Sequence, residues 1–146
     1  MPTTIDSAGI TFNDATSLTS ANIGTAQLVN GSVIASKLGT TEQKQICKAW
    51  VNFDGTTSPG TIRSSYNVSS VTKNGTGDYT VNFATAMADA NYSSVIAVRK
   101  NLDGISANLP SFYNTAFNTG NVRVASAALG NNGSDSDTMS VAIFGN

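Results

Sequence analysis

The sequence has no histidine, a single cysteine and a single glutamate, and charged residues make up only 12% of its 146 positions. The missing histidine removes the commonest general base, the commonest metal ligand and the usual switch near neutral pH. Cleavage of a glycosidic bond needs two closely set carboxyl groups, whereas the only glutamate, Glu42, lies in a polar connecting segment. We therefore expect a protein that is not an enzyme and that uses no cofactor and no metal.

The scarcity of cysteine and of positive charge excludes further classes. Cys47 has no second cysteine to pair with, and we expect it to be a small buried hydrophobic residue rather than a nucleophile. The net charge of −1 predicts no nucleic-acid binding. No apolar run approaches the roughly 20 residues that span a bilayer, so we expect no membrane insertion. Residues 1–4 do not begin a signal peptide, which predicts synthesis in the cytoplasm of the producing cell.

One pair of carboxylates raises the alternative of a calcium site. Asp135 and Asp137 are spaced as DSD in a loop rich in glycine and asparagine, and calcium prefers such oxygen ligands. The remaining positions of a calcium-binding loop are not matched. A solvated turn is therefore the favoured interpretation.

Uncharged polar residues replace the missing charges, and their types favour strands and turns. Threonine suits strands, whereas asparagine, glycine and serine suit turns. In residues 66–83, Tyr79, Val81 and Phe83 alternate with polar residues, as in a strand with one buried face. The preceding segment 74–78 can reverse the chain tightly because glycine adopts positive φ without steric cost. These residues predict an antiparallel hairpin.

Comparable patterns continue from residue 46 to the C-terminus and predict an all-β fold, an antiparallel β-sandwich of about seven or eight strands. Besides the hairpin, the expected strands lie at 46–53, 61–71, 92–100, 121–129 and 138–146. We expect residues 95–98 to form a buried centre and Met87 to pack onto the domain from a loop. Trp50 falls on the opposite face from its apolar neighbours, and we interpret it equally as a core residue or as a subunit-interface anchor.

The N-terminal segment is poor in apolar side chains and carries a short repeat. Residues 22–31 can be laid over residues 32–41. The apolar positions that we expect to support oligomerisation are Ile23, Leu28, Val33 and Leu38. Each repeat has too few apolar residues to bury alone, whereas three parallel chains bury them along a shared axis. A flexible tether with incidental periodicity is the alternative.

A helical turn is expected between this segment and the strands. Residues 40–45 begin with threonine, a fair N-cap, and Glu42 suits the positive end of a helix. The sequence thus predicts two parts, an N-terminal attachment and trimeric shaft segment at 1–45 and a β-sandwich head at 46–146.

The best candidate for ligand binding is the irregular segment 101–120, because loops on a rigid scaffold often carry function. Its aromatic side chains can stack on sugar faces, and its amides can hydrogen-bond to hydroxyls. The candidate receptor-binding residues are Tyr113, Phe112, Phe117, Asn108 and Asn114. The alternative is that Phe112 and Phe117 are strand residues that face the core, which leaves Tyr113 as the exposed member.

Three stretches of the chain, AWVNFDG (49–55), YNVSSVTKNGTGDYTVNFATAMADANYS (66–93) and SVAIFGN (140–146), resemble a domain of bacteriophage tail-fibre and related virion proteins, of the type found in phages of aquatic bacteria including cyanobacteria. Residues 8–40 also resemble the N-terminal region of such fibres. The resemblance implies a structural protein of the virion, a homotrimer without catalytic residues. Release by host lysis accounts for the lack of a secretion signal.

The resulting expectation is a short trimeric tail fibre located in the virion. Its N-terminal segment attaches to the tail baseplate or an adaptor, and its head binds a glycan on the host cell surface. The alternative is a capsid decoration or head-fibre protein with the same fold and no receptor role.

Overall fold

The computed structural model describes residues 4–6, 9–11, 17–18, 33–34, 37–99, 109–128 and 132–145. The chain divides into two compact units, Met1–Gly39 and Thr40–Asn146. The predicted helical turn forms as α1 (Thr40–Gln45) and belongs to the second unit, so the observed division precedes the predicted one by six residues. No helix among the described residues has the length and apolarity to cross a membrane.

The first unit contains a small antiparallel sheet. Its strands are β1 (Thr4–Asp6), β2 (Gly9–Thr11) and β3 (Ser17–Leu18), in that order across the sheet. Of the residues predicted to support oligomerisation, Val33 is exposed and Leu38 is half-buried, whereas Ile23 and Leu28 lie outside the described residues.

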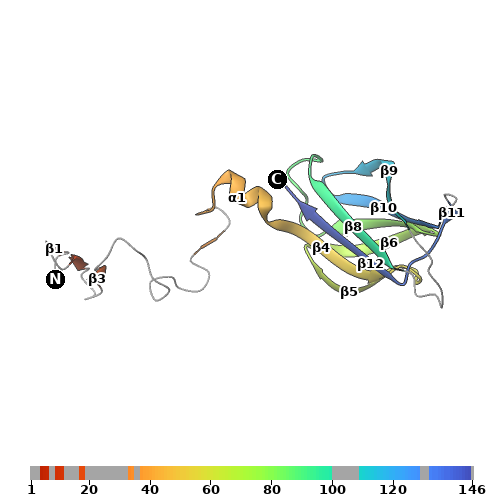
Figure 1. The fold of residues 1–146 in the computed structure, drawn as a ribbon, viewed down its shortest axis with the longest axis horizontal. Helices are drawn as coiled ribbons and strands as arrows, with labels where there is room; N and C mark the ends of the chain where they lie inside the picture. Colours follow the sequence, from red (N-terminus) through yellow and green to blue (C-terminus); the bar gives the residue numbers. More distant parts are fainter. Residues whose placement is uncertain are drawn as a thin grey trace. The chain divides into compact units, whose positions relative to one another are not determined.

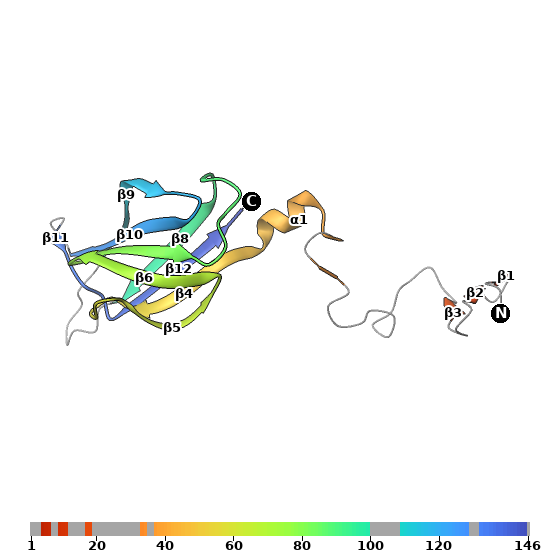
Figure 2. The same ribbon diagram turned by 180° about the vertical axis from the view of Figure 1, so that it is seen from behind.

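The second unit is a sandwich of two antiparallel sheets, which confirms the predicted fold class (Figure 1). The four-stranded sheet has the order β5 (Thr61–Tyr66), β4 (Cys47–Asp54), β12 (Thr138–Phe144), β8 (Ser93–Arg99). The five-stranded sheet has the order β11 (Asn132–Gly133), β10 (Asn121–Ala128), β7 (Asp78–Phe83), β6 (Val68–Gly75), and β9 (Leu109–Phe117) also pairs with β10. Figure 2 shows the five-stranded sheet in front of the four-stranded one.

The core lies between the two sheets and is built from alternating strand positions. Every second residue of β4, β7, β10 and β12 is buried, as expected for strands with one face on the core. The largest fully buried apolar side chains are Tyr79, Phe53, Met139, Ile143, Val51, Val71, Val81, Val122 and Val124. Met87 joins this cluster from the loop after β7, as predicted.

The predicted buried centre of strand 92–100 is half wrong. In β8, Val95 and Ala97 point outward and are exposed, whereas Ile96 and Val98 are partly buried and pack against the core. Because successive side chains of a strand point to opposite faces, four consecutive apolar residues cannot all face one core. Two of them therefore lie on the outer surface of the four-stranded sheet.

The segment predicted to be one strand at 61–71 is divided between the two sheets. β5 pairs with β4 in the four-stranded sheet, and β6 pairs with β7 in the five-stranded sheet. The chain passes from one to the other at Asn67, which has a positive φ of 53°. Its side-chain amide donates to the carbonyl oxygens of Lys48 and Thr85, and its Oδ1 accepts from the Thr85 amide.

Replacing Asn67 by alanine should lower the free energy of unfolding by about 2 kcal/mol. Alanine is strained at positive φ by roughly 1–2 kcal/mol. The three hydrogen bonds that are lost add little, because two of them are exposed and water replaces them. Urea unfolding of the full chain measures the effect. Asn67→Gly should show a smaller loss, because glycine removes the hydrogen bonds without the backbone strain. Equal losses in the two variants would mean that backbone conformation contributes nothing at this corner.

Candidate functional site

The outer face of the four-stranded sheet carries two neighbouring rows of side chains. Strand pairing aligns Trp50 with Tyr66 on one side and with Ala142 on the other, and Ala142 is aligned with Val95. Residues directly opposite each other in antiparallel strands share a face. One row is therefore mostly aromatic and apolar, and it crosses all four strands.

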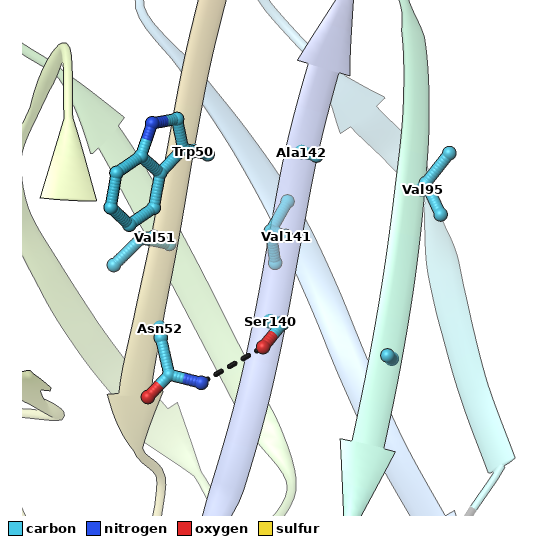
Figure 3. Close-up of a pocket in the computed structure, with 8 residues that line it drawn as sticks. Trp50, Val51, Asn52, Val95, Ser140, Val141 and Ala142 are labelled. Carbon is cyan, nitrogen blue, oxygen red and sulfur yellow. Dashed lines mark hydrogen bonds between the residues drawn. The ribbon is translucent and has the colours of Figure 1, made fainter. Parts of the chain in front are cut away.

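The adjacent row is small and polar. Asn52 is aligned with Ser64 on β5 and with Ser140 on β12, and Ser140 is aligned with Ala97 on β8. The Asn52 amide donates a hydrogen bond of 2.9 Å to the Ser140 hydroxyl oxygen, and this bond fixes both groups side by side (Figure 3). We call the eight residues of the two rows the Trp50 face.

The Trp50 face exposes much of its apolar surface. The exposed fractions are 59% for Tyr66, 57% for Val95 and 38% for Trp50. Between Trp50 and Val95 the sheet is hollowed, with an open volume of about 340 Å³. In Figure 3, Trp50 and Val95 come from β4 and β8, the strands on either side of β12, with the small Ala142 between them, and the indole lies on the side of β4 away from β12.

Charged groups lie beyond the polar row and are paired with one another. Arg63 Nη2 lies 3.1 Å from Asp54 Oδ2, and Arg99 Nη2 lies 3.1 Å from Asp137 Oδ2. The residues that line the hollow carry no charge. At the other end, Lys48 lines a separate, smaller hollow with residues of α1. The hollow beside Trp50 is thus neutral and combines an aromatic ring with a fixed amide–hydroxyl pair, whereas Lys48 carries a positive charge on the other side of Trp50.

The exposure of Trp50 decides between the two interpretations of this residue. Ala49, Val51 and Phe53 are buried, and Trp50 points away from them to the outer face. The interpretation of Trp50 as a core residue is therefore wrong. An exposed tryptophan fits a contact with another molecule, and the subunit-interface role stays a prediction.

Half of the predicted binding segment 101–120 is a strand. β9 covers Leu109–Phe117 and pairs with β10, so the expected loop is wrong for these residues. Tyr113, Phe112 and Asn114 belong to β9, but their side chains lie outside the described part of the chain, as does all of Asn108. The role of these four residues in receptor binding stays a prediction.

Phe117 is the one predicted receptor residue whose side chain is described. It is partly exposed, and its ring packs against Tyr92 with 5.3 Å between ring centroids. Tyr92 in turn packs edge-on against Phe83, and its hydroxyl donates to the carbonyl oxygens of Asn118 and Asn121. Phe117 therefore has one face against the domain, which supports the core alternative for part of this side chain.

A second polar cluster joins three loops at one end of the sandwich. Asp135 Oδ2 accepts from Lys73 Nζ at 2.7 Å, and its Oδ1 accepts from the Gly77 amide and the Tyr79 hydroxyl, both at 2.8 Å. Lys73 Nζ also donates to the carbonyl oxygen of Gly55 at 3.0 Å. The solvated-turn interpretation is therefore wrong for Asp135, because protein donors surround its carboxylate.

The same contacts shift two pKa values. Burial alone would raise the pKa of Asp135, but the hydrogen bonds from Lys73, the Gly77 amide and Tyr79 outweigh it and hold the pKa below its usual range. Burial, together with the hydrogen bond to the negative Asp135, raises the pKa of Tyr79 well above its usual range. Asp135 therefore stays ionised and Tyr79 stays a neutral phenol across the physiological range, so the cluster links the loops structurally and is not a proton-transfer site.

The lone thiol belongs to neither site. Cys47 is half-buried rather than buried, and its thiol lies 3.2 Å from the carbonyl oxygen of Ala49. Among the described residues, no three acidic or cysteine side chains are grouped in a way that holds a metal ion.

Comparison with protein-family models, curated proteins and solved structures finds no match to this chain. The interpretation of its function therefore depends on the residues themselves and on the resemblance described for the sequence.

Proposed function

We propose that this chain is a structural protein of a phage virion, a short trimeric tail fibre whose sandwich binds the host cell surface. The N-terminal segment attaches the fibre to the tail and brings three chains together. The sandwich acts as a non-catalytic binding head. Three heads per fibre and several fibres per particle turn weak surface contacts into firm adhesion through effective concentration.

The observation that carries the proposal is the Trp50 face. A sandwich that serves only as a spacer has no need to expose a tryptophan and a tyrosine in one cross-strand row. Aromatic residues are enriched where proteins bind other molecules. The neutral hollow beside Trp50 offers shape and hydrogen-bonding groups without acid–base chemistry, which suits recognition better than catalysis.

Immunogold labelling of intact virions with an antibody to residues 40–146 tests the location. We expect gold at the tail. The antibody should also block adsorption of the virions to host cells, whereas the same antibody pre-absorbed with the purified chain should not. Gold over the head would favour the capsid decoration or head-fibre role instead, and would leave the sandwich without a receptor to bind.

A further inference from the structure

We propose that the Trp50 face binds a neutral pyranose sugar, whose ring stacks on Trp50 and whose hydroxyls bond to Asn52 and Ser140. The inference rests on the proposed function, because it names the ligand class and the site that the fibre head uses on the host surface. It also moves the expected binding site from residues 101–120 to the four-stranded sheet, whereas β9 pairs in the five-stranded one.

The first support is the chemistry of the two rows. A pyranose ring has an apolar face of C–H groups and a rim of hydroxyls, so it needs an aromatic platform beside hydrogen-bonding groups. The aromatic row supplies the indole of Trp50, and the polar row supplies Asn52 and Ser140 one residue pair further along the same strands. Tryptophan combines a large apolar surface with low conformational entropy, which suits it to such stacking.

The second support is the shape of the face. Adjacent strands lie about 4.8 Å apart, so Trp50 and Val95, two strands apart, flank a hollow rather than touch. Its volume of about 340 Å³ lies at the small end of ligand sites. A site of this size takes a single sugar residue at the end or side of a glycan. Ala142 lines the hollow between Trp50 and Val95, where a larger side chain would fill it.

The third support is the fixed polar pair. The hydrogen bond from the Asn52 amide to Ser140 uses one of the two amide hydrogens. It leaves the Ser140 hydroxyl hydrogen, the second amide hydrogen and the Asn52 carbonyl oxygen, which points away from Ser140 in Figure 3, able to bond to another molecule. Groups held in place before binding lose less entropy when the ligand arrives. The pair therefore orients hydroxyls while the indole holds the ring.

The electrostatics of the face select a neutral sugar. The residues that line the hollow are uncharged, and Arg63 and Arg99, beyond the polar row, already contact Asp54 and Asp137. The lining of the hollow offers an acidic sugar no cation to compensate its desolvation, and Lys48, on the same side of β4, lies beyond Trp50 and lines a separate hollow. We therefore expect preference for neutral hexoses or N-acetylhexosamines over uronic acids.

The same features argue against a two-fold contact between this face and the same face of a second copy. Stable subunit contacts bury roughly 800 Å² per partner with dense packing. Two such faces pressed together would set hollow against hollow and would desolvate Asn52 and Ser140 without new partners. A sugar fills the hollow and satisfies the polar pair.

The only tryptophan of the chain provides a direct probe of this site. Trp50 emission is recorded while the full chain is titrated with the methyl pyranosides of glucose, galactose, mannose and N-acetylglucosamine, and with methyl glucuronide. We expect a saturable change with at least one neutral probe and at least tenfold weaker binding of the uronide. No saturable change with any neutral probe would overturn the proposal. If the Trp50 emission shifts with protein concentration in sugar-free buffer, the sugar site is overturned in favour of a contact between copies of the chain at this face.

Variants locate the site. Asn52→Ala and Ser140→Ala should each weaken binding of the same probe about tenfold, the loss expected for one good hydrogen bond. Asn82→Ala is the matched control, because its amide donates to Ser70 and Thr72 on the other sheet. Its affinity should be unchanged. Equal weakening by Asn82→Ala would overturn the site, and thermal unfolding of each variant separates lost binding from lost folding.

Adsorption of virions separates this inference from the proposed function. Virions that carry Trp50→Ala should adsorb at least tenfold more slowly, provided that the variant fibre assembles normally. If Tyr113→Ala slows adsorption and Trp50→Ala does not, the fibre role stands and the Trp50 site is overturned. In a third assay, the purified chain is added as a competitor, or the antibody is added to the virions. If neither of them slows adsorption, the fibre role itself is overturned.

Discussion

Gly77→Ala should lower the free energy of unfolding of the second unit by about 4 kcal/mol, among the largest effects of a single substitution. Gly77 has φ +68°, where an alanine is strained by roughly 1–2 kcal/mol. A Cβ atom there would also lie 2.1 Å from the carbonyl oxygen of Ser126 and 2.5 Å from the amide nitrogen of Ser134. Both are backbone atoms, so the clash is relieved only by moving strands.

That movement would break contacts on both sides of the turn. The Gly77 carbonyl oxygen accepts from the Ser126 amide at 2.8 Å, and the Gly77 amide donates to Asp135 at 2.8 Å. The turn thus joins β6 and β7 to β10 and to the loop before β12. Hydrogen bonds lost here add about 1 kcal/mol each to the steric strain.

Gly75→Ala is the matched control, two residues earlier in the same turn region. A Cβ atom at Gly75 meets nothing within 4 Å, and its φ is outside the left-handed region. We expect a change of less than about 0.5 kcal/mol, the usual range for surface substitutions. Guanidinium unfolding of the three proteins measures both effects. Similar stabilities of the two variants would mean that the close approach of Ser126 to the turn is not present in solution.

The sequence predicted this hairpin well because its information is local. The alternation of apolar and polar residues indicates that Tyr79, Val81 and Phe83 face the core. The glycine-rich turn indicates where the chain reverses. β10 and β12 were predicted for the same reason. Helix α1 was predicted from its N-cap and first-turn charge.

The prediction failed where the deciding contact is distant in sequence. In β8 the run Val95–Ile96–Ala97–Val98 is apolar throughout, so it carries no alternation to show which residues face outward. The division of 61–71 depends on contacts of Asn67 with residues 18 and 19 positions away. β9 was not predicted because its sequence is irregular and shows no clear alternation of apolar and polar residues. The strand is formed by its pairing with β10.

The Trp50 face could be predicted only in part. The sequence shows that Trp50 lies on the opposite face of its strand from Val51. It does not show that Tyr66, Ala142 and Val95 share its row, because that requires the register of three separate strand pairs. The hollow follows from this register, and so does the pairing of Asn52 with Ser140, which are 88 positions apart.

Asp135→Asn should lower the free energy of unfolding by about 2–3 kcal/mol at neutral pH. The substitution removes the negative charge that faces the ammonium group of Lys73 at 2.7 Å, and the Lys73 side chain is only 14% exposed. Breaking a fully buried ion pair costs about 3–5 kcal/mol. The effect here is smaller because Asp135 keeps 28% of its side chain in contact with solvent.

Asp137→Asn provides the comparison for an exposed pair. Its partner Arg99 is 69% exposed, so loss of this charge should change stability by less than about 1 kcal/mol. Urea unfolding of both variants and the unsubstituted protein measures the difference. An Asp135→Asn effect no larger than that of Asp137→Asn would mean that solvent screens Lys73 as well as it screens Arg99.

The pH dependence separates the charge of Asp135 from its shape. Its pKa is lower in the folded protein than in the unfolded chain, so its carboxylate stabilises the fold fully above the unfolded value of about 3.9. This contribution is lost as the pH falls through the lower folded value, where both states become protonated. The stability difference between the unsubstituted protein and Asp135→Asn should therefore be constant from about pH 7 to pH 5 and shrink below about pH 4. If this stability difference stays unchanged at low pH, the effect of Asp135→Asn comes from lost hydrogen-bond geometry around Gly77 and Tyr79 and not from the lost charge. That geometry does not change when Asp135 is protonated.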